Sequence, residues 1–196
     1  MATNTSDTSA ATSLDGKELP QPGTWQIDPA HSDISFTARH MMISKVRGHF
    51  RQFTGTILVA DPPEQSSVEA VIDAASIDTG DPQRDAHLRS ADFLDVEKYP
   101  HVLFHSTSVR RAGDRFEVTG SLRLREVTRT VTLSLEYCGV AVDPWGKTRA
   151  AFVASTEINR EDFEITWNQA LEAGGFLVGK GVKIEIDVEA VRDADE

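Results

Sequence analysis

A two-residue alternation of apolar and polar side chains, repeated along most of the chain, constrains the fold more than any other feature. In the segment 182–188, Val and Ile alternate with Lys183, Glu185 and Asp187. The same period recurs at 33–39, 115–124, 130–137 and 150–158. Successive side chains of a strand point to opposite faces, so each segment has one apolar and one polar face. Such strands pair antiparallel, because parallel sheets are buried on both faces.

About eight such strands predict a closed antiparallel β-barrel, and the fold class is therefore all-β. A barrel of this size is either packed solid or holds one slender ligand. Small residues such as Ala38, Ala150 and Ala154 share the inward rows with Phe36 and Phe152, which would leave an elongated channel. Large side chains on facing strands could also fill those gaps, as in an ordinary core. The alternation alone leaves both outcomes open.

The segment 76–100 carries the signals of one short helix. Asp81 is a suitable N-cap, and Pro82 fits the first helical position, where a missing N–H costs nothing. On a 3.6-residue period Arg84, His87 and Leu88 then share one face. A helix with a mixed basic and apolar face, in a chain of strands, suits a cap over the mouth of a barrel. Barrel mouths are preferred ligand sites.

Composition limits the kind of partner. The chain has 196 residues, 39% hydrophobic and 26% charged, which suits one globular domain. Its formal net charge of −11 argues against binding DNA or RNA and opposes docking on an anionic membrane surface. We therefore expect small molecules or proteins as partners, with a homodimer left open.

The N-terminal residues differ in composition from the rest. Residues 1–22 are rich in Ser, Thr and Ala and lack the apolar run of a secretory signal, so they predict a flexible tail. The barrel domain is then expected over 23–192. No later segment has the length of an apolar membrane span, so a cytoplasmic protein is expected. The single Cys138 cannot form an internal disulfide and is expected to be a small, buried strand residue.

No pattern typical of a metal site, a cofactor site or a known catalytic motif is found. The six histidines show no HxH or helical HxxxH pair, and His101 and His105 lie about 13 Å apart if they are in a strand. We expect His31 and His40 to make structural hydrogen bonds. GxSxG, CxxC and glycine-rich phosphate loops are missing from the sequence. The four glycines of 174–181 predict a turn into the last strand.

Several unusual blocks resemble the polyisoprenoid-binding, YceI-like family. They are WQIDPAHSDISFTARHM, RGHFRQFTG, SIDTG, RDAHLRSADFLDVEKYP, VTGSLRLREVTRTVTL and REDFEITWN, and the match runs collinearly over about 23–190. The chain departs from the family pattern at Glu126 and Glu164, where Gly is usual, and at Thr130, where Pro is usual. The resemblance implies a lipocalin-like antiparallel barrel with an apolar lumen. It further implies long polyprenyl ligands, with isoprenoid quinones and polyprenyl phosphates as the suspected class, and no catalytic reaction.

Together these observations predict a non-catalytic protein that binds, stores or transports a polyisoprenoid lipid inside the barrel. The alternative is a hydrolase-type enzyme acting on a small amphiphile at the barrel mouth. Eleven residues are predicted to line the lumen: Phe36, Phe50, Phe53, Phe93, Phe104, Leu122, Leu124, Leu133, Phe152, Ala154 and Trp167.

Discrimination between head groups requires polar groups at the mouth. Arg84 and His87 are predicted for this role, because guanidinium and imidazole donors suit a phosphate or a quinone carbonyl. The alternative is that Arg84, Asp85, Arg89 and Asp92 only ion-pair the helix to neighbouring loops. Asp85 and Arg89 are also spaced as an i,i+4 pair beside this face.

Overall fold

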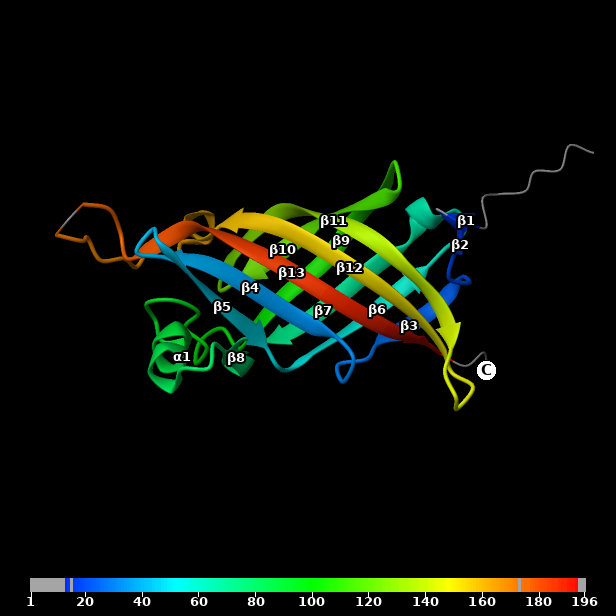
Figure 1. Ribbon diagram of the computed structural model, residues 1–196, viewed down its shortest axis with the longest axis horizontal. Coiled ribbons are helices and arrows are strands. Elements are labelled where there is room, and N and C mark those ends of the chain that lie inside the picture. Colours follow the sequence, from blue (N-terminus) through cyan, green and yellow to red (C-terminus); the bar gives the residue numbers. More distant parts are fainter. Residues whose placement is uncertain (1–12, 15, 173, 194–196) are drawn as a thin grey trace, which may run out of the picture.

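Residues 13–14, 16–172 and 174–193 are described by the computed structural model of the chain (Figure 1). The strands in this part of the chain are β1 (Ser13–Leu14), β2 (Lys17–Glu18), β3 (Gly23–Ile27), β4 (Asp33–His40), β5 (Ser44–Phe50), β6 (Phe53–Val59), β7 (Ser67–Asp73), β8 (Ile77–Asp78), β9 (His101–Ala112), β10 (Arg115–Leu124), β11 (Val127–Val142), β12 (Thr148–Asn159) and β13 (Val178–Arg192). The helical segments are α1 (Pro82–Arg89) and the 3₁₀ turns η1 (Pro63–Gln65), η2 (Ala74–Ser76) and η3 (Arg160–Phe163).

The strands close into an antiparallel barrel. Its order is β12-β11-β10-β9-β7-β6-β3-β13, and β13 pairs again with β12 to complete the ring. Along its other edge the long strand β13 pairs first with β4 and then with β3, so β4, β5 and β8 extend the wall beside β3. Closure leaves few strand edges unpaired. The predicted fold class, an antiparallel barrel of about eight strands with one short helix, is confirmed.

The barrel has two ends with different covers (Figure 1). We call one the α1 end, because α1, the β4–β5 turn, the β10–β11 turn and the loop before β13 lie there. We call the other the N-terminal end, because β1, β2, η1 and the β11–β12 turn lie there. Two core clusters follow this division: one contains Phe93, Phe163 and Ile165, and the other contains Trp25 and Tyr137.

The predicted helix is present, and its cap is as expected. The Asp81 side chain accepts hydrogen bonds from the amides of Gln83 and Arg84, both at 3.0 Å, and Pro82 begins α1. The predicted Asp85–Arg89 pair is wrong. Asp85 is buried and accepts from the Thr79 amide and hydroxyl, whereas Arg89 donates to the carbonyl oxygens of residues 75 and 77. Both side chains turn toward the segment before the helix because its backbone groups need partners.

Part of the predicted tail packs on the barrel. Leu14 is buried, the Trp25 indole donates to the Gln21 carbonyl at 3.1 Å, and the Tyr137 hydroxyl donates to the Glu18 carbonyl. Leu14 and its neighbours therefore bury apolar surface among the described residues between 13 and 22, and the flexibility expected of residues 1–22 stays a prediction. Residues 1–12 lie outside the described residues.

Two further details concern single residues. Cys138 lies in β11 as predicted but is exposed, because it sits at a bulge between Tyr137 and Gly139 on the polar face. Glu164, where the family pattern has Gly, adopts a left-handed backbone with φ 59° at the end of η3. The local turn thus keeps the conformation that glycine favours. No helix within the described ranges is long and apolar enough to cross a membrane.

Candidate ligand-binding site

The inward rows of the strands enclose a hollow apolar cavity of about 590 Å³. Leu88, Phe93 and Leu94 line it at the α1 end, and Leu19 and Pro22 line it at the N-terminal end. The cavity therefore follows the barrel for its whole length. Its volume lies within the range of about 300–1,000 Å³ that small-molecule sites occupy. The alternation of apolar and polar residues is compatible with either a filled or a hollow barrel, and the structure shows a hollow one.

Ten of the eleven residues predicted to line the lumen do line this cavity: Phe36, Phe50, Phe53, Phe93, Phe104, Leu122, Leu124, Leu133, Phe152 and Ala154. Trp167 does not. Its ring packs outside the cavity on Phe93 and His87, with centroids 5.3 and 4.6 Å apart, although Ile165 of the same segment does line the cavity. The prediction also left out lining residues that the same alternation marks, including Ile34, Val118, Ile184 and Ile186.

Glycines opposite two aromatic residues help to keep the lumen open. Phe36 on β4 faces Gly48 on β5, and a Cβ at Gly48 would lie 2.4 Å from the Phe36 ring. A Cβ at Gly120 would lie 2.6 Å from the Phe104 ring. Each ring therefore occupies the space over a neighbouring glycine, along the barrel wall. Cross-strand neighbours of Ala154, such as Leu135 and Ile186, likewise leave the space above it unfilled.

The few polar residues that line the cavity differ between its ends. Glu18 and Asp61 line the N-terminal end, whereas Arg160 lines the α1 end. Ser35 and Thr156 lie between them, and the Ser35 hydroxyl already donates to a β13 carbonyl at 3.3 Å. The lumen is therefore apolar along its length, with two exposed acidic residues at the rim of one end and a buried cation at the other.

Arg160 is the polar residue that the sequence did not indicate. Its side chain is 4% exposed, and it donates four hydrogen bonds to carbonyl oxygens, at 2.6 Å to Ile165, 2.9 Å to Trp167, 3.0 Å to Gly179 and 3.3 Å to Val178. No carboxylate of the described residues lies within 4.0 Å of it, and burial lowers its pKa. An arginine still stays protonated, so the α1 end holds a buried positive charge.

The two predicted head-group residues do not line the cavity. The Arg84 guanidinium donates to the Thr79 hydroxyl at 2.7 Å and to the Thr79 carbonyl at 3.0 Å. His87 bonds Asp92 at 2.9 Å, and its ring packs edge-on against Trp167 and Phe93 at 4.6 and 5.0 Å. Both residues thus have partners outside the cavity, and His87 packs on Phe93, which lines the α1 end of the cavity. Their role in binding a head group stays a prediction.

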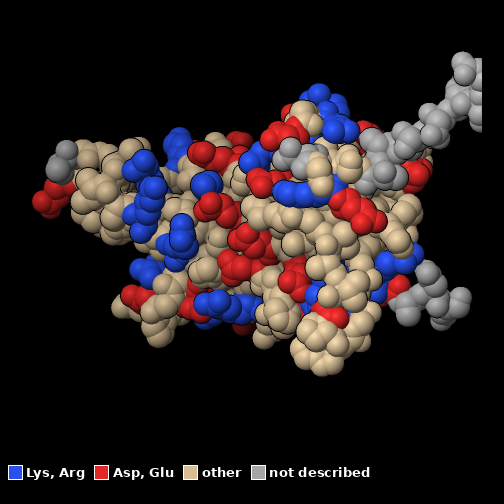
Figure 2. Space-filling model, turned by 45° about the vertical axis from the view of Figure 1, so that its right-hand side comes forward, with Lys and Arg blue, Asp and Glu red and all other residues tan. Residues whose placement is uncertain are grey.

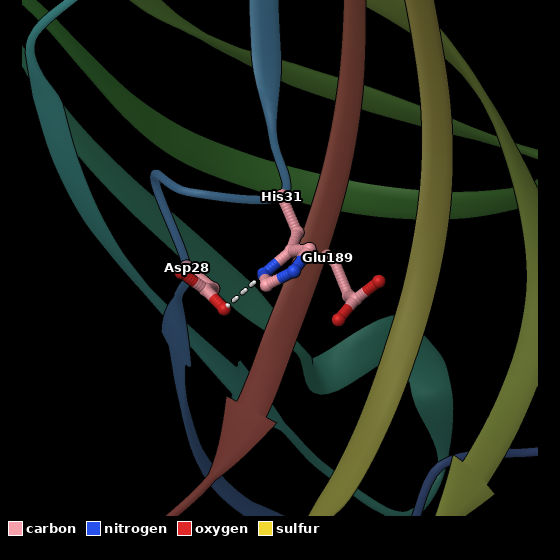
Figure 3. Close-up of side chains that lie close together, drawn as sticks. All are labelled: Asp28, His31 and Glu189. Carbon is pink, nitrogen blue, oxygen red and sulfur yellow. Dashed lines mark hydrogen bonds and ion pairs between the residues drawn. The ribbon is translucent and has the colours of Figure 1, made fainter. Parts of the chain in front are cut away.

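A second polar cluster lies at the barrel wall, outside the cavity. Asp28, His31 and Glu189 converge there (Figure 3), with the Asp28 carboxylate 2.8 Å from the His31 ring. The Arg149 guanidinium also bonds Asp28 at 2.8 Å, Glu189 at 2.6 Å and Asp143 at 2.9 Å. Arg149, followed by His31, lowers the pKa of Asp28 to about 2. The Arg149 guanidinium already bonds each of these carboxylates, so the cluster is a structural ion-pair network that joins β3, β12 and β13.

Comparison with known proteins identifies the family. The profile described as YceI-like domain matches residues 25–190, almost the whole barrel. The chain belongs to the YceI-like family. Protein YceI of Salmonella newport (strain SL254) is 42% identical over 137 residues, which cover 69% of this chain and 72% of the relative. The family resemblance read from the sequence blocks is confirmed.

Solved structures share the YceI-like barrel. Burkholderia cenocepacia BcnA superposes with a TM-score of 0.73 at 24% identity, covering 83% of this chain and 98% of that chain. A polyisoprenoid binding domain from Saccharophagus degradans, implicated in plant cell wall breakdown, superposes with a TM-score of 0.67 at 13% identity, covering 88% and 100%. At these identities both structures show a common fold.

Proposed function

We propose that this chain binds one long-chain polyisoprenoid lipid inside the barrel and stores or transports it without chemical change. The observation that carries the proposal is the 590 Å³ lumen, whose lining is apolar along the full barrel. Burial of each methylene-sized group stabilises by about 0.8 kcal/mol, so a polyprenyl tail can bind tightly without a polar anchor. The polyisoprenoid binding domain of Saccharophagus degradans, which shares this fold, supports the choice of ligand class.

The charges at the two ends favour one orientation of the ligand. An anionic head group would meet carboxylates of Glu18 and Asp61 at the N-terminal end and the Arg160 guanidinium at the α1 end. Opposite charges attract strongly where water is excluded. We therefore place a polyprenyl phosphate head, or the carbonyl of an isoprenoid quinone, at the α1 end, with the tail toward residues 19–22.

The head-group role predicted for Arg84 has a selective test. Arg84→Ala should weaken a polyprenyl phosphate by about 1.5–3 kcal/mol, the scale of a hydrogen bond to a charged group, and scarcely change the affinity for an uncharged polyprenol. Equal losses for the two ligands would assign Arg84 to the structural contacts with Thr79. Titration of delipidated protein with each lipid provides the measurement.

The geometry favours binding over catalysis. No histidine lines the cavity in the described part of the chain, and Ser35, a potential nucleophile in the lining, bonds a backbone carbonyl rather than a base. Nucleophilic catalysis requires a base within hydrogen-bond reach of the nucleophile. The hydrolase-type alternative would instead appear as chemically altered lipid after incubation.

Native mass spectrometry of protein purified without detergent tests the proposal. We expect a mass increment of about one isoprenoid lipid per chain, identified by organic extraction. Delipidated protein should take up polyprenyl phosphate or a menaquinone-type lipid again. Protein that is lipid-free and stays so after incubation with both would overturn the carrier function. Cell fractionation would test the predicted cytoplasmic location.

A further inference from the structure

The α1 end carries an exposed apolar projection that the barrel fold does not require. It consists of Met41, Met42 and Ile43 in the β4–β5 turn, which are 40%, 58% and 81% exposed, and Phe176 in the loop before β13, which is 52% exposed. The Met41 amide donates to the Leu177 carbonyl at 2.8 Å, which holds the turn and the loop together. We call these four residues the apolar tip; their segments project at the left of Figure 1.

The backbone of the turn makes its composition unusual. Met41 and Met42 both have positive φ values, 52° and 64°, and the Ile43 amide donates to the His40 carbonyl at 3.2 Å. A turn with two left-handed central residues strongly prefers Asn and Gly. Two methionines there add strain and expose apolar surface, so folding alone does not account for them. Methionine side chains are flexible and polarizable, which suits insertion into an irregular apolar environment.

Cations surround the base of the apolar tip. Arg39 and Lys45 lie directly opposite each other on the outer faces of β4 and β5, both exposed, and no carboxylate of the described residues lies within 4.0 Å of either. Lys180, Lys183 and Arg47 lie close by and pair with carboxylates, Lys180 with Glu161 and the other two with Glu185. We call Arg39 and Lys45 the free cations of this end.

The carboxylates that face or pair with the nearby cations are Glu157, which faces Lys183 across β12 and β13, and the paired Glu161 and Glu185, while Glu172 lies in the loop before β13. Arg39 and Lys45 are thus left without a carboxylate within 4.0 Å among the described residues, in a chain whose net charge is −11. Figure 2 shows blue side chains gathered beside the projecting left side of the molecule.

We propose that the apolar tip and the free cations dock the chain on an anionic lipid bilayer. The tip inserts into the interfacial region while Arg39 and Lys45 contact the lipid phosphates. Salt screens charges beyond about 8 Å, so the local balance at the tip decides docking and the distant negative charge matters little. Docking brings the α1 end of the cavity to the membrane. The docking itself is independent of the proposed function; only the identity of the lipid that enters or leaves the cavity there rests on it.

The N-terminal end offers a natural control. Its β11–β12 turn exposes Val142 at 67% and Trp145 at 83%, which is also an apolar projection. However, the neighbouring Asp143 pairs with Arg149, and this turn contributes one exposed cation, Lys147, where the apolar tip has both Arg39 and Lys45. Apolar exposure with a single such cation beside a carboxylate should bind anionic bilayers more weakly. The two projections therefore differ in their cations more than in their apolar exposure.

Vesicle sedimentation with the full chain tests the proposal. Vesicles of phosphatidylglycerol and phosphatidylcholine should bind the wild type, with binding reduced at high salt and on pure phosphatidylcholine. Arg39→Gln/Lys45→Gln should lower the partition coefficient about tenfold or more, since each basic residue near an anionic surface contributes roughly a fivefold factor. Met42→Ser/Ile43→Ser should lower it about tenfold or more as well, because two inserted apolar side chains are lost. The matched control Trp145→Ser should change binding by less than about twofold. Thermal unfolding confirms that each variant is folded.

Several outcomes would overturn membrane docking. One is that the wild-type protein stays in solution with anionic vesicles. Another is that binding is lost in Trp145→Ser but kept in Met42→Ser/Ile43→Ser. A third is that the apolar tip joins two copies of the chain, seen in sedimentation as a dimer that Met42→Ser/Ile43→Ser abolishes. Native mass spectrometry of the same samples separates this inference from the proposed function. If the protein carries a bound isoprenoid but does not bind vesicles, the proposed carrier function is supported and the proposed membrane docking is contradicted.

Discussion

The two ends of this barrel are covered by different means and carry opposite charges. At the N-terminal end, residues 18–22, which include Glu18, line the lumen together with Asp61, and Trp25 is fully buried. At the α1 end, a helix and two loops form the cover, and Arg160 supplies a buried cation. Because of this difference the two ends of the cavity are not equivalent, and a ligand with an anionic head and an apolar tail fits the cavity in one orientation.

The covers also differ in how they are held. Arg160 joins the loops at the α1 end through hydrogen bonds to four backbone carbonyls, whereas the N-terminal end depends mainly on packing of Leu14, Trp25 and Tyr137. A cover made of loops around one polar side chain can open locally at lower cost than a packed apolar cluster. The α1 end is therefore the expected route for lipid entry.

The largest effect is expected from Arg160→Leu. This change leaves four carbonyl groups without their donor, and we expect the free energy of unfolding to fall by about 3–5 kcal/mol. Arg160→Lys keeps the charge with fewer donors and should recover part of that loss. Urea denaturation measures both. Arg89→Leu, which removes bonds to two carbonyls at the same end, serves as the control; a loss for Arg160→Leu no larger than for Arg89→Leu would contradict the role assigned to Arg160.

Ala154→Trp tests whether the lumen is free space midway between the ends. In a filled core such overpacking costs about 1–3 kcal/mol. In the observed cavity the indole has room, so we expect stability within about 1 kcal/mol of the wild type. Uptake of long polyprenyl chains should fall by at least about tenfold, a change of about 1.4 kcal/mol, and short chains should lose less. Strong destabilisation with an unchanged preference for tail length would mean that this row packs solid.

Acid titration probes the Asp28 network, which fastens β3 near the N-terminal end. The folded state lowers the pKa of Asp28 to about 2 through Arg149 and His31. A lowered pKa stabilises the fold above the ordinary carboxylate range, and this contribution disappears as the pH falls toward about 2. With solvent screening we expect about 1–2 kcal/mol. Asp28→Asn should therefore be less stable than wild type at neutral pH, and the difference should vanish in acid. A pH-independent difference would contradict this assignment.

The smallest effect concerns the N-terminal cover itself. Tyr137→Phe removes the hydroxyl that donates to the Glu18 carbonyl and should cost about 1 kcal/mol. Burial, followed by the Glu18 charge, raises the pKa of Tyr137 to about 12. Alkaline absorbance titration should therefore show one late phenol that is absent in Tyr137→Phe. A Tyr137 phenol that ionises in the ordinary tyrosine range would show that this end opens readily.

Sequence reasoning succeeded where local pattern determines structure. Side-chain alternation along each strand predicted the barrel and ten of its lining residues, and the Asp81–Pro82 signal predicted the start of α1. These features depend on the residues within one element. The hollow lumen could not be decided in this way, because it depends on which residues face each other across strands.

The failures share a tertiary cause. Arg160 looks like a surface charge in the sequence, and only the folded loops bring four carbonyls around it. Trp167 lies outside the lumen because its ring packs on His87 and Phe93, which are distant in the sequence. Asp85 and Arg89 were expected to pair with each other but bond the segment before α1, whose position the helix pattern does not reveal.

Photo-crosslinking tests the central claim most directly. A polyprenyl phosphate with a diazirine on its last isoprene unit is loaded into delipidated protein, irradiated, and mapped by peptide mass spectrometry. We predict one lipid per chain, with crosslinks to cavity residues of the N-terminal end such as Leu19, Phe116 and Tyr137, because the head lies at Arg160. Crosslinks concentrated at Phe93 and Leu94 would reverse the orientation, and crosslinks confined to the outer surface would contradict lipid binding inside the barrel.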